Sequence, residues 1–193
     1  MRYNLSEAFD LIKDRRTIYP EFYSERKIHK EIIEKLLNAA IWAPTHGNTQ
    51  PWRFTIFAEE ARQELADFLV TSYKETIPEE NWVANKIEKL ETRPLRASTV
   101  IAVSMHRQDS ERIPEVEEIE ATACATQNIL LMATAYGLGS FWSTPKFLSN
   151  QKTNDFLGLR PQDKCLGLIY LGYPNIEWPK GQRKPIEYIS NWR

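Results

Sequence analysis

Two adjacent arginines and a threonine, Arg15, Arg16 and Thr17, stand at the end of a predicted first helix. Two guanidinium groups and a hydroxyl can hold a phosphate through charge-assisted, bidentate hydrogen bonds. The same cations could instead compensate the negative end of the helix that precedes them. For this run taken alone, the second interpretation is the commoner one.

A loop bounded by two prolines offers a different set of polar groups. Residues 43–52 read APTHGNTQPW, and the loop contains a hydroxyl, an imidazole and two carboxamides, from Thr45, His46, Asn48 and Gln50. A carboxamide both donates and accepts hydrogen bonds, which suits the edge of a flavin or of a nucleic-acid base. An ordinary turn that leads into a strand at Trp52 explains the same residues equally well.

Two glycines, Gly137 and Gly139, resemble part of a dinucleotide-binding turn. They follow a predicted helix and precede a predicted strand, which is the reverse of what such a turn requires. We therefore interpret them as a helix C-terminus that allows the backbone to approach a flat ligand closely. The cations of the irregular tail, taken alone, are typical of a solvated terminus; they are Lys180, Arg183 and Lys184.

Residues for other chemistries are sparse. The three histidines, His29, His46 and His106, are isolated, and the sequence has no Cys/His spacing typical of a metal site. There is no nucleophile elbow, no phosphate-binding P-loop motif and no prominent pair of acids. The sequence therefore predicts no catalytic side chain and no metal, and it favours a bound cofactor that carries the chemistry.

Length and composition set the class of protein. The chain has 193 residues, so we expect a single domain over residues 1–193 or one subunit whose core a partner completes. A hydrophobic fraction of 42% excludes disorder, and a net charge of −1 argues against a nucleic-acid binder. The uncharged stretch 121–145 is interrupted by polar residues, so we predict a buried helix and no membrane span. The N-terminus has no signal-peptide core, and Cys124 and Cys165 predict buried free thiols in the cytoplasm.

Apolar periodicity predicts an α+β fold. The expected helices are one capped by Ser6, one from about His29 to before Pro44, and four more at 59–76, 81–93, 111–136 and 145–156. The expected strands are 52–57, 98–105, 141–144 and 164–171, with a further edge strand at 185–189. This order favours a small mixed or antiparallel central sheet packed by helices.

Four segments together resemble the FMN-dependent nitroreductase family. They are RRTIYPEF, LLNAAIWAPTHGNTQPWRF, ATQNILLMATAYGLGSFW, and LGLIYLGYP with its basic tail, in that order over nearly the whole chain. The short length is similar to that of the compact members without a long helical insertion. The resemblance implies an intertwined homodimer with two FMN sites at the subunit interface. It also implies an enzyme that takes hydride from NAD(P)H and passes electrons to a nitroaromatic, a quinone or a similar small molecule by a ping-pong mechanism.

The resemblance further implies which residues bind FMN. One subunit would hold the phosphate with Arg15, Arg16 and Thr17, joined by Arg183 or Lys184. The other subunit would contribute Pro44, Thr45, His46 and Asn48, and the flavin would lie along Trp142, Ser143 and Thr144.

One departure from the family concerns Tyr19, which stands where many members carry a lysine or arginine. That cation would stabilise the anionic reduced flavin, so the source of this stabilisation stays open. An alternative function is therefore a flavin-binding carrier or sensor with little reductase turnover. A dimeric scaffold without enzymatic activity is a third hypothesis.

Overall fold

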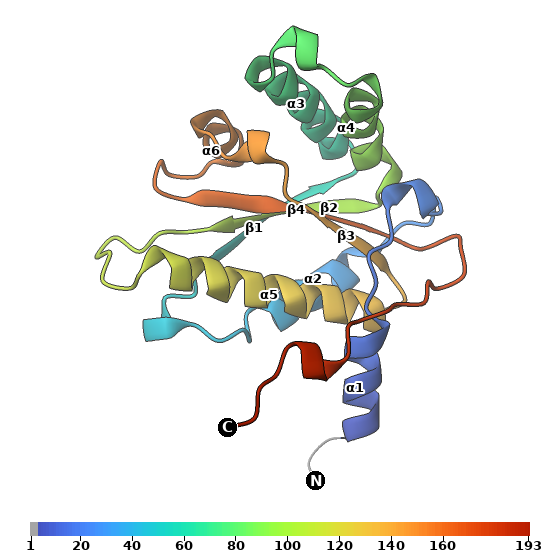
Figure 1. Cartoon of the computed structure of the whole chain (residues 1–193). Coiled ribbons are helices and arrows are strands. Elements are labelled where there is room, and N and C mark those ends of the chain that lie inside the picture. Colours follow the sequence, from blue (N-terminus) through green and yellow to red (C-terminus); the bar gives the residue numbers. More distant parts are fainter. Residues whose placement is uncertain (1–3) are drawn as a thin grey trace.

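The structure is a computed structural model that describes residues 4–193. Within them, four strands form one antiparallel sheet in the order β1-β2-β4-β3, and six α-helices surround it (Figure 1). The strands are β1 (Trp52–Ala58), β2 (Thr99–Met105), β3 (Gly139–Ser143) and β4 (Lys164–Gly172). The helices are α1 (Leu5–Asp14), α2 (Lys30–Ala40), α3 (Ala61–Thr76), α4 (Ala84–Arg96), α5 (Glu115–Ala135) and α6 (Gln151–Leu157). The predicted α+β class is confirmed, and the sheet is antiparallel rather than mixed.

The sheet separates two layers of helices. Helices α2 and α5 cover one face, and α3, α4 and α6 lie on the other (Figure 1). Side chains alternate between the faces of a strand. Along β2, Ile101 and Val103 join the core with α2 and α5, whereas Val100 and Ala102 join the opposite core. All seven residues of β2 are buried, as an interior strand with two covered faces requires.

Helix α5 contains, from residue 121 onward, the uncharged helical stretch that the sequence predicts. Its first turn carries Glu115, Glu117 and Glu118, where negative charge is favoured by the helix dipole. Thr122 and Thr126 are fully buried, and their hydroxyls donate to the carbonyls of Glu118 and Thr122 at 2.8 and 3.0 Å. The polar interruptions are therefore satisfied inside the helix. Among residues 4–193, no helix is long and apolar enough to cross a membrane.

Gly167 allows the end of β3 to lie against β4. The pairing of β2 with β4 is irregular between Val103 and Ser104, and Gly167 has a φ of 124°. A Cβ atom at this position would lie 2.4 Å from the carbonyl oxygen of Ser143. A glycine is therefore required here, and it fixes the backbone at the end of β3.

Two predicted helix ends are wrong by a few residues. Asn4 rather than Ser6 caps α1, because its side-chain oxygen accepts hydrogen bonds from the backbone N–H groups of Ser6 and Glu7 at 3.1 and 3.4 Å. Helix α4 does not end before Pro94 but continues to Arg96. Pro94 removes one intrahelical hydrogen bond near the helix end and is the buried residue of α4.

Three further expectations differ from the structure. The predicted helix 145–156 is split into a 3₁₀ turn at Lys146–Leu148 and α6, because the Asn150 side chain accepts from Thr153 N at 2.9 Å and starts a new helix. The tail forms a 3₁₀ turn at Ile186–Tyr188 instead of an edge strand. In the single chain Cys124 is exposed and Cys165 is half-buried, so the prediction of two buried thiols is wrong for Cys124.

Candidate functional site

A cavity of about 280 Å³ lies where the segment after α1 meets α5 and β3. Its lining residues are Arg15, Thr17, Gln127, Leu130, Ser140 and Trp142. Thr17 pairs with Ser140 in a parallel bridge, and the backbone N–H of Ile18 donates to the Ser140 carbonyl at 3.0 Å. The segment after α1 therefore runs along the outer edge of β3. This places the predicted phosphate run beside Trp142 of the predicted flavin run.

Gln127 is a lining residue that sequence reasoning missed. It lies on α5 with its side chain exposed, and in the sequence it is one of the polar residues that interrupt the uncharged stretch 121–145. The available signal was a carboxamide in a helix that otherwise reads as uncharged and apolar. That signal does not say which side of the helix faces a ligand, so it could not identify the site.

The two adjacent arginines have different environments. The Arg16 guanidinium donates to the carbonyls of Lys13 and Arg15 at 2.5 and 2.7 Å, and so it compensates the end of α1. The Arg15 guanidinium lines the cavity and makes no hydrogen bond or ion pair within the described residues. The helix-end interpretation therefore fits Arg16, and the ligand interpretation fits Arg15.

The basic tail passes close to these arginines. Trp178 Nε1 donates to the Asp14 carbonyl at 2.7 Å, and a Cβ atom on Gly181 would lie 2.2 Å from the guanidinium carbon of Arg16. Partial burial and then the charges of Arg183 and Arg16 lower the pKa of Arg15. The cavity residue Arg15 therefore feels two further guanidinium charges, from Arg16 and Arg183, and no acid among the described residues contributes to its pKa shift.

The second tail cation lies apart from this cluster. Lys184 is exposed and makes no hydrogen bond or ion pair within residues 4–193. Of the two tail residues predicted to reach the phosphate, Arg183 is thus the one whose charge acts on Arg15.

The proline-bounded loop lies at the other end of α5. His46 Nδ1 is 2.6 Å from Glu117 Oε2 in the first turn of that helix, whereas the cavity touches α5 at Gln127 and Leu130. Ten residues of helix separate these points by about 15 Å. The single chain therefore does not bring Pro44, Thr45, His46 and Asn48 to the cavity. A site that contains both groups requires the loop from a second subunit.

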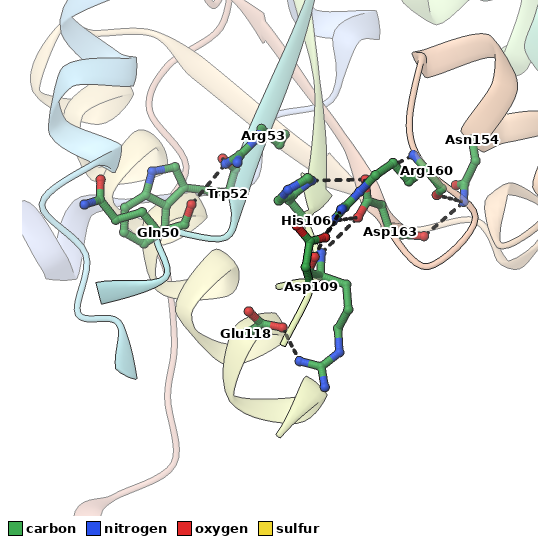
Figure 2. Close-up of polar contacts among 10 residues, drawn as sticks. Gln50, Trp52, Arg53, His106, Asp109, Glu118, Asn154, Arg160 and Asp163 are labelled. Carbon is green, nitrogen blue, oxygen red and sulfur yellow. Dashed lines mark hydrogen bonds and ion pairs between the residues drawn. The ribbon is translucent and has the colours of Figure 1, made fainter. Parts of the chain in front are cut away.

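The loop itself is stiff and internally bonded. Thr45 Oγ1 lies 3.0 Å from Thr49 Oγ1, and Gln50 Nε2 donates to Asn48 Oδ1 at 3.0 Å. Asn48 and Gln50 have positive φ values of 53° and 44°. Such conformations in residues other than glycine are uncommon and gather at functional sites. Arg53 Nη1 fixes the Gln50 carbonyl at 3.0 Å (Figure 2).

The predicted flavin run is held at the end of β3. Trp142 Nε1 donates to the Leu166 carbonyl at 3.2 Å, which fixes the half-buried indole against β4. Ser143 is half-buried and Thr144 is exposed. Tyr19 does not join this side of the strand, because its ring packs on Phe141 with 4.8 Å between the centroids.

A second charged cluster, which the sequence did not predict, joins the start of α5 to the sheet (Figure 2). Arg107 N donates to Asp163 Oδ1 at 2.9 Å, and Arg107 Nη1 donates to Glu118 Oε2 at 2.5 Å. His106 Nδ1 lies 3.2 Å from Asp163 Oδ2, and Arg160 also bonds to Asp163. The expectation that His106 is isolated is therefore wrong. It is paired with an acid 57 residues away in the chain.

The charges of this cluster are paired with one another, although Glu118 Oε1 is buried without a hydrogen-bond partner. Burial alone would raise the pKa of Asp163, but hydrogen bonds from the Arg107 backbone and from Arg160, with the His106 charge, hold that pKa below its usual value. The cluster also holds the first turn of α5, because Arg107 bonds to Glu118. Glu117, the preceding residue in that turn, is the partner of His46. In the part of the chain that the structure describes, no group of His, Cys, Asp and Glu residues could hold a metal ion.

Comparisons with known proteins agree with these observations. Residues 12–173 match the sequence profile of the nitroreductase family. YdjA of Escherichia coli K12, provisionally named as an NAD(P)H nitroreductase, is 26% identical over 176 residues, which are 89% of this chain and 90% of YdjA. A crystal structure of a nitroreductase-like family protein from Bacillus cereus has a TM-score of 0.84 at 29% identity, covering 100% of this chain and 98% of that one. A Desulfovibrio desulfuricans structure, provisionally described as a nitroreductase in complex with FMN, has a TM-score of 0.73 at 24% identity, covering 99% and 98%.

Proposed function

Because the chain belongs to the nitroreductase family, we propose that it is an FMN-dependent oxidoreductase. In this proposal it takes hydride from NAD(P)H and passes electrons to a nitroaromatic, a quinone or a similar acceptor by a ping-pong mechanism. The observation that carries the proposal is the cavity lined by Arg15, whose guanidinium has no acid partner within residues 4–193 and feels the charges of Arg183 and Arg16. The provisional name of YdjA and the FMN complex of the Desulfovibrio protein point the same way.

The residues around this cavity fit the phosphate of FMN. Arg15 has a free guanidinium, Arg183 adds charge, and Thr17 adds a hydroxyl at the cavity wall. A phosphate carries about two negative charges at neutral pH and accepts several strong hydrogen bonds. We assign Arg16 a supporting role, because its guanidinium already holds the end of α1.

The site requires a homodimer in which each subunit is one domain over residues 1–193. Helix α1 has no buried residue and exposes Leu5, Phe9 and Ile12. Trp42, at the end of α2, is 84% exposed, and Trp192 in the tail is 95% exposed. Apolar surface of this extent marks a protein interface. A second subunit that covers it would also bring Pro44, Thr45, His46 and Asn48 toward the cavity.

In this mechanism the chain binds and orients, and FMN supplies the hydride-accepting and electron-donating chemistry when bound. Arg15 and Arg183 would hold the phosphate of FMN, while the Thr17 hydroxyl would bind the ribityl phosphate group next to them. The Trp142–Thr144 segment would limit the position of the ring, because its backbone is fixed against Gly167. The stiff loop of the other subunit would offer the Asn48 carboxamide to the ring edge. No side chain of this chain is assigned as an essential proton donor.

An anaerobic titration of the purified protein tests the proposal. We expect a yellow dimer with bound FMN that loses its colour when NADPH is added and regains it when a quinone or nitroaromatic is added. A yellow protein that NADPH does not bleach would support the carrier or sensor alternative, which Tyr19 favours because it replaces a cation near the flavin. A colourless protein that binds no added FMN would contradict both the oxidoreductase and the carrier or sensor hypotheses. It would support the dimeric scaffold without enzymatic activity.

A further inference from the structure

A second cavity, of about 630 Å³, lies beside the end of α4. It forms where residues 20–27, the start of α3 and residues 92–98 meet, and it shares no lining residue with the cavity at Arg15. Helix α1 and the C-terminus, whose exposed apolar side chains we assign to the dimer, lie on the α5 side of the sheet, whereas α4 lies on the opposite side (Figure 1). We therefore expect the homodimer to leave this cavity open.

Cations outnumber acids in the wall of this cavity. The cations are Arg26, Lys27, Arg62 and Arg96, and the acids are Glu21 and Glu25. Glu21 Oε1 already accepts hydrogen bonds from Arg93 at 2.9 Å. None of the lining cations has an ion pair within residues 4–193. Because the whole chain has a net charge of −1, the positive excess is local to this wall and not a property of the surface in general.

Arg62 is held in place by backbone carbonyls and not by an acid. Its Nη1 donates to the carbonyls of Leu95 and Ala97 at 2.9 and 2.5 Å, and its Nε donates to the Glu59 carbonyl at 3.1 Å. These bonds compensate the negative end of α4, which would otherwise repel an anion. The Nη2 group of Arg62 has no hydrogen bond within the described residues, so it remains free to donate to a ligand.

Two further groups in the wall have fixed positions. The guanidinium carbon of Arg26 lies 3.9 Å from the ring centroid of Tyr173, and the face of an aromatic ring attracts a cation at this distance. Ser98 Oγ accepts a hydrogen bond from the Ile28 N–H at 2.8 Å, which leaves the Ser98 hydroxyl proton to donate elsewhere. Groups that are already fixed lose little entropy when a ligand binds. The wall therefore offers oriented donors and positive charge, which suit the oxygens of a phosphate.

The rest of the wall is largely apolar, and the cavity is too large for an inorganic ion alone. Pro20, Leu95 and Ala97 line it, together with Tyr23, whose hydroxyl already donates to the Ile18 carbonyl at 2.8 Å. Sites for small organic molecules have volumes of about 300–1,000 Å³ and combine apolar walls with a few polar groups. The ligand that fits has phosphate at one end and an apolar or flat part at the other.

We propose that this cavity binds a small organic phosphate of nucleotide size, in addition to the FMN site. The charges of Arg26, Lys27 and Arg96 would attract the phosphate groups. Arg62 and Ser98 would donate hydrogen bonds to them, and the apolar wall would pack against the rest of the ligand. The inference goes beyond the proposed function and does not depend on FMN binding.

Calorimetric titration of the protein in the presence of saturating FMN tests the proposal. Three probes separate charge from shape: ADP carries phosphates and a base, pyrophosphate carries charge alone, and adenosine carries the base alone. We expect one ADP per chain, about tenfold weaker binding of pyrophosphate and at least about a hundredfold weaker binding of adenosine, and added salt should weaken ADP binding. Arg26→Gln and Arg96→Gln should each raise the dissociation constant for ADP about tenfold, and Arg96→Lys, which keeps the charge, should retain most of the affinity.

Arg112→Gln is the matched control, because Arg112 is an exposed cation between β2 and α5 that does not line this cavity. Its affinity for ADP should equal that of the unaltered protein, as should that of Arg15→Ala, which alters the FMN cavity. Equal affinities of the Arg26, Arg96 and Arg112 variants for ADP would overturn the inference, and so would the absence of both ADP and pyrophosphate binding. Loss of ADP binding in Arg15→Ala but not in Arg96→Gln would assign the anion to the FMN cavity and also overturn it. A protein that binds no FMN but binds ADP in a manner that depends on Arg96 would reject the proposed function alone.

Discussion

Two charged clusters in this molecule contain arginines in opposite situations. At the start of α5, Arg107 and Arg160 meet the acids Glu118 and Asp163, so each cation has an acid partner. Toward the other end of α5, Arg15 lines a cavity, feels the charge of Arg183 and has no acid partner within residues 4–193. A fold that buries a charge depends on the partner that compensates this charge, whereas cations without acid partners are suited to an anionic ligand. On this difference we propose a structural role for the first cluster and ligand binding for the second.

Breaking the paired cluster should have the largest effect on stability. Glu118→Ala leaves Arg107 buried without its carboxylate, and loss of one partner of a buried pair removes about 3–5 kcal/mol of unfolding free energy. Urea unfolding followed by circular dichroism measures this change. Glu120→Ala, an exposed acid on the same helix, is the control and should leave the unfolding midpoint in place. Equal midpoints for the two variants would mean that the cluster does not support the fold.

Breaking the unpaired cluster should instead affect ligand binding. Arg15→Ala should raise the dissociation constant for FMN tenfold to a hundredfold, because a charge-assisted hydrogen bond contributes about 1.5–3 kcal/mol. Arg16→Ala should raise it by less than about threefold, since Arg16 bonds to α1 carbonyls. Fluorescence titration of the apoprotein with FMN measures both. Riboflavin, which has no phosphate, separates the roles: if Arg15→Ala weakens riboflavin equally, the variant has lost structure rather than a phosphate ligand.

The tail carries two neighbouring cations, Arg183 and Lys184, whose effects on FMN binding can be compared. Arg183→Ala should weaken FMN binding by about tenfold, because the Arg183 charge reaches Arg15. Lys184→Ala should have little effect, since Lys184 is exposed and unpaired in the described chain. Calorimetric titration at two salt concentrations checks this, and the effect of Arg183 should shrink at high salt. The opposite order of effects would place Lys184 at the phosphate.

The smallest effect is expected at His46, where the proline-bounded loop contacts Glu117 beside the paired cluster. His46→Gln keeps hydrogen-bonding capacity near Glu117 but removes the imidazole. The rate of FMN reduction by NADPH, followed by anaerobic stopped flow, should fall by less than about tenfold, or about 1.4 kcal/mol of barrier. A loss of about a thousandfold with normal FMN binding would make His46 a catalytic residue.

Most of the secondary structure could be predicted from the sequence. Of the two charged clusters, the sequence indicates the one at Arg15 but not the one at Asp163. Helices and strands follow from local periodicity, and Arg15, Thr17 and Trp142 are site candidates from the sequence because each stands in a short recognisable run. The pairing of His106 with Asp163 joins residues 57 positions apart, and no local pattern predicts it. The split between Arg15 and Arg16 depends on which guanidinium reaches the α1 carbonyls, and a run of two arginines does not contain that information. Asn150 shows the same limit, because its side chain ends one turn and starts α6 where the sequence reads as one helix.

The most direct test of the account compares the affinities of the unaltered apoprotein for FMN and for riboflavin. If the unpaired guanidinium cluster binds a phosphate, FMN should bind at least about a hundredfold more tightly than riboflavin, and this ratio should decline with added salt. In Arg15→Ala the ratio should fall by about tenfold or more. Equal affinities for FMN and riboflavin in the unaltered protein would contradict the account.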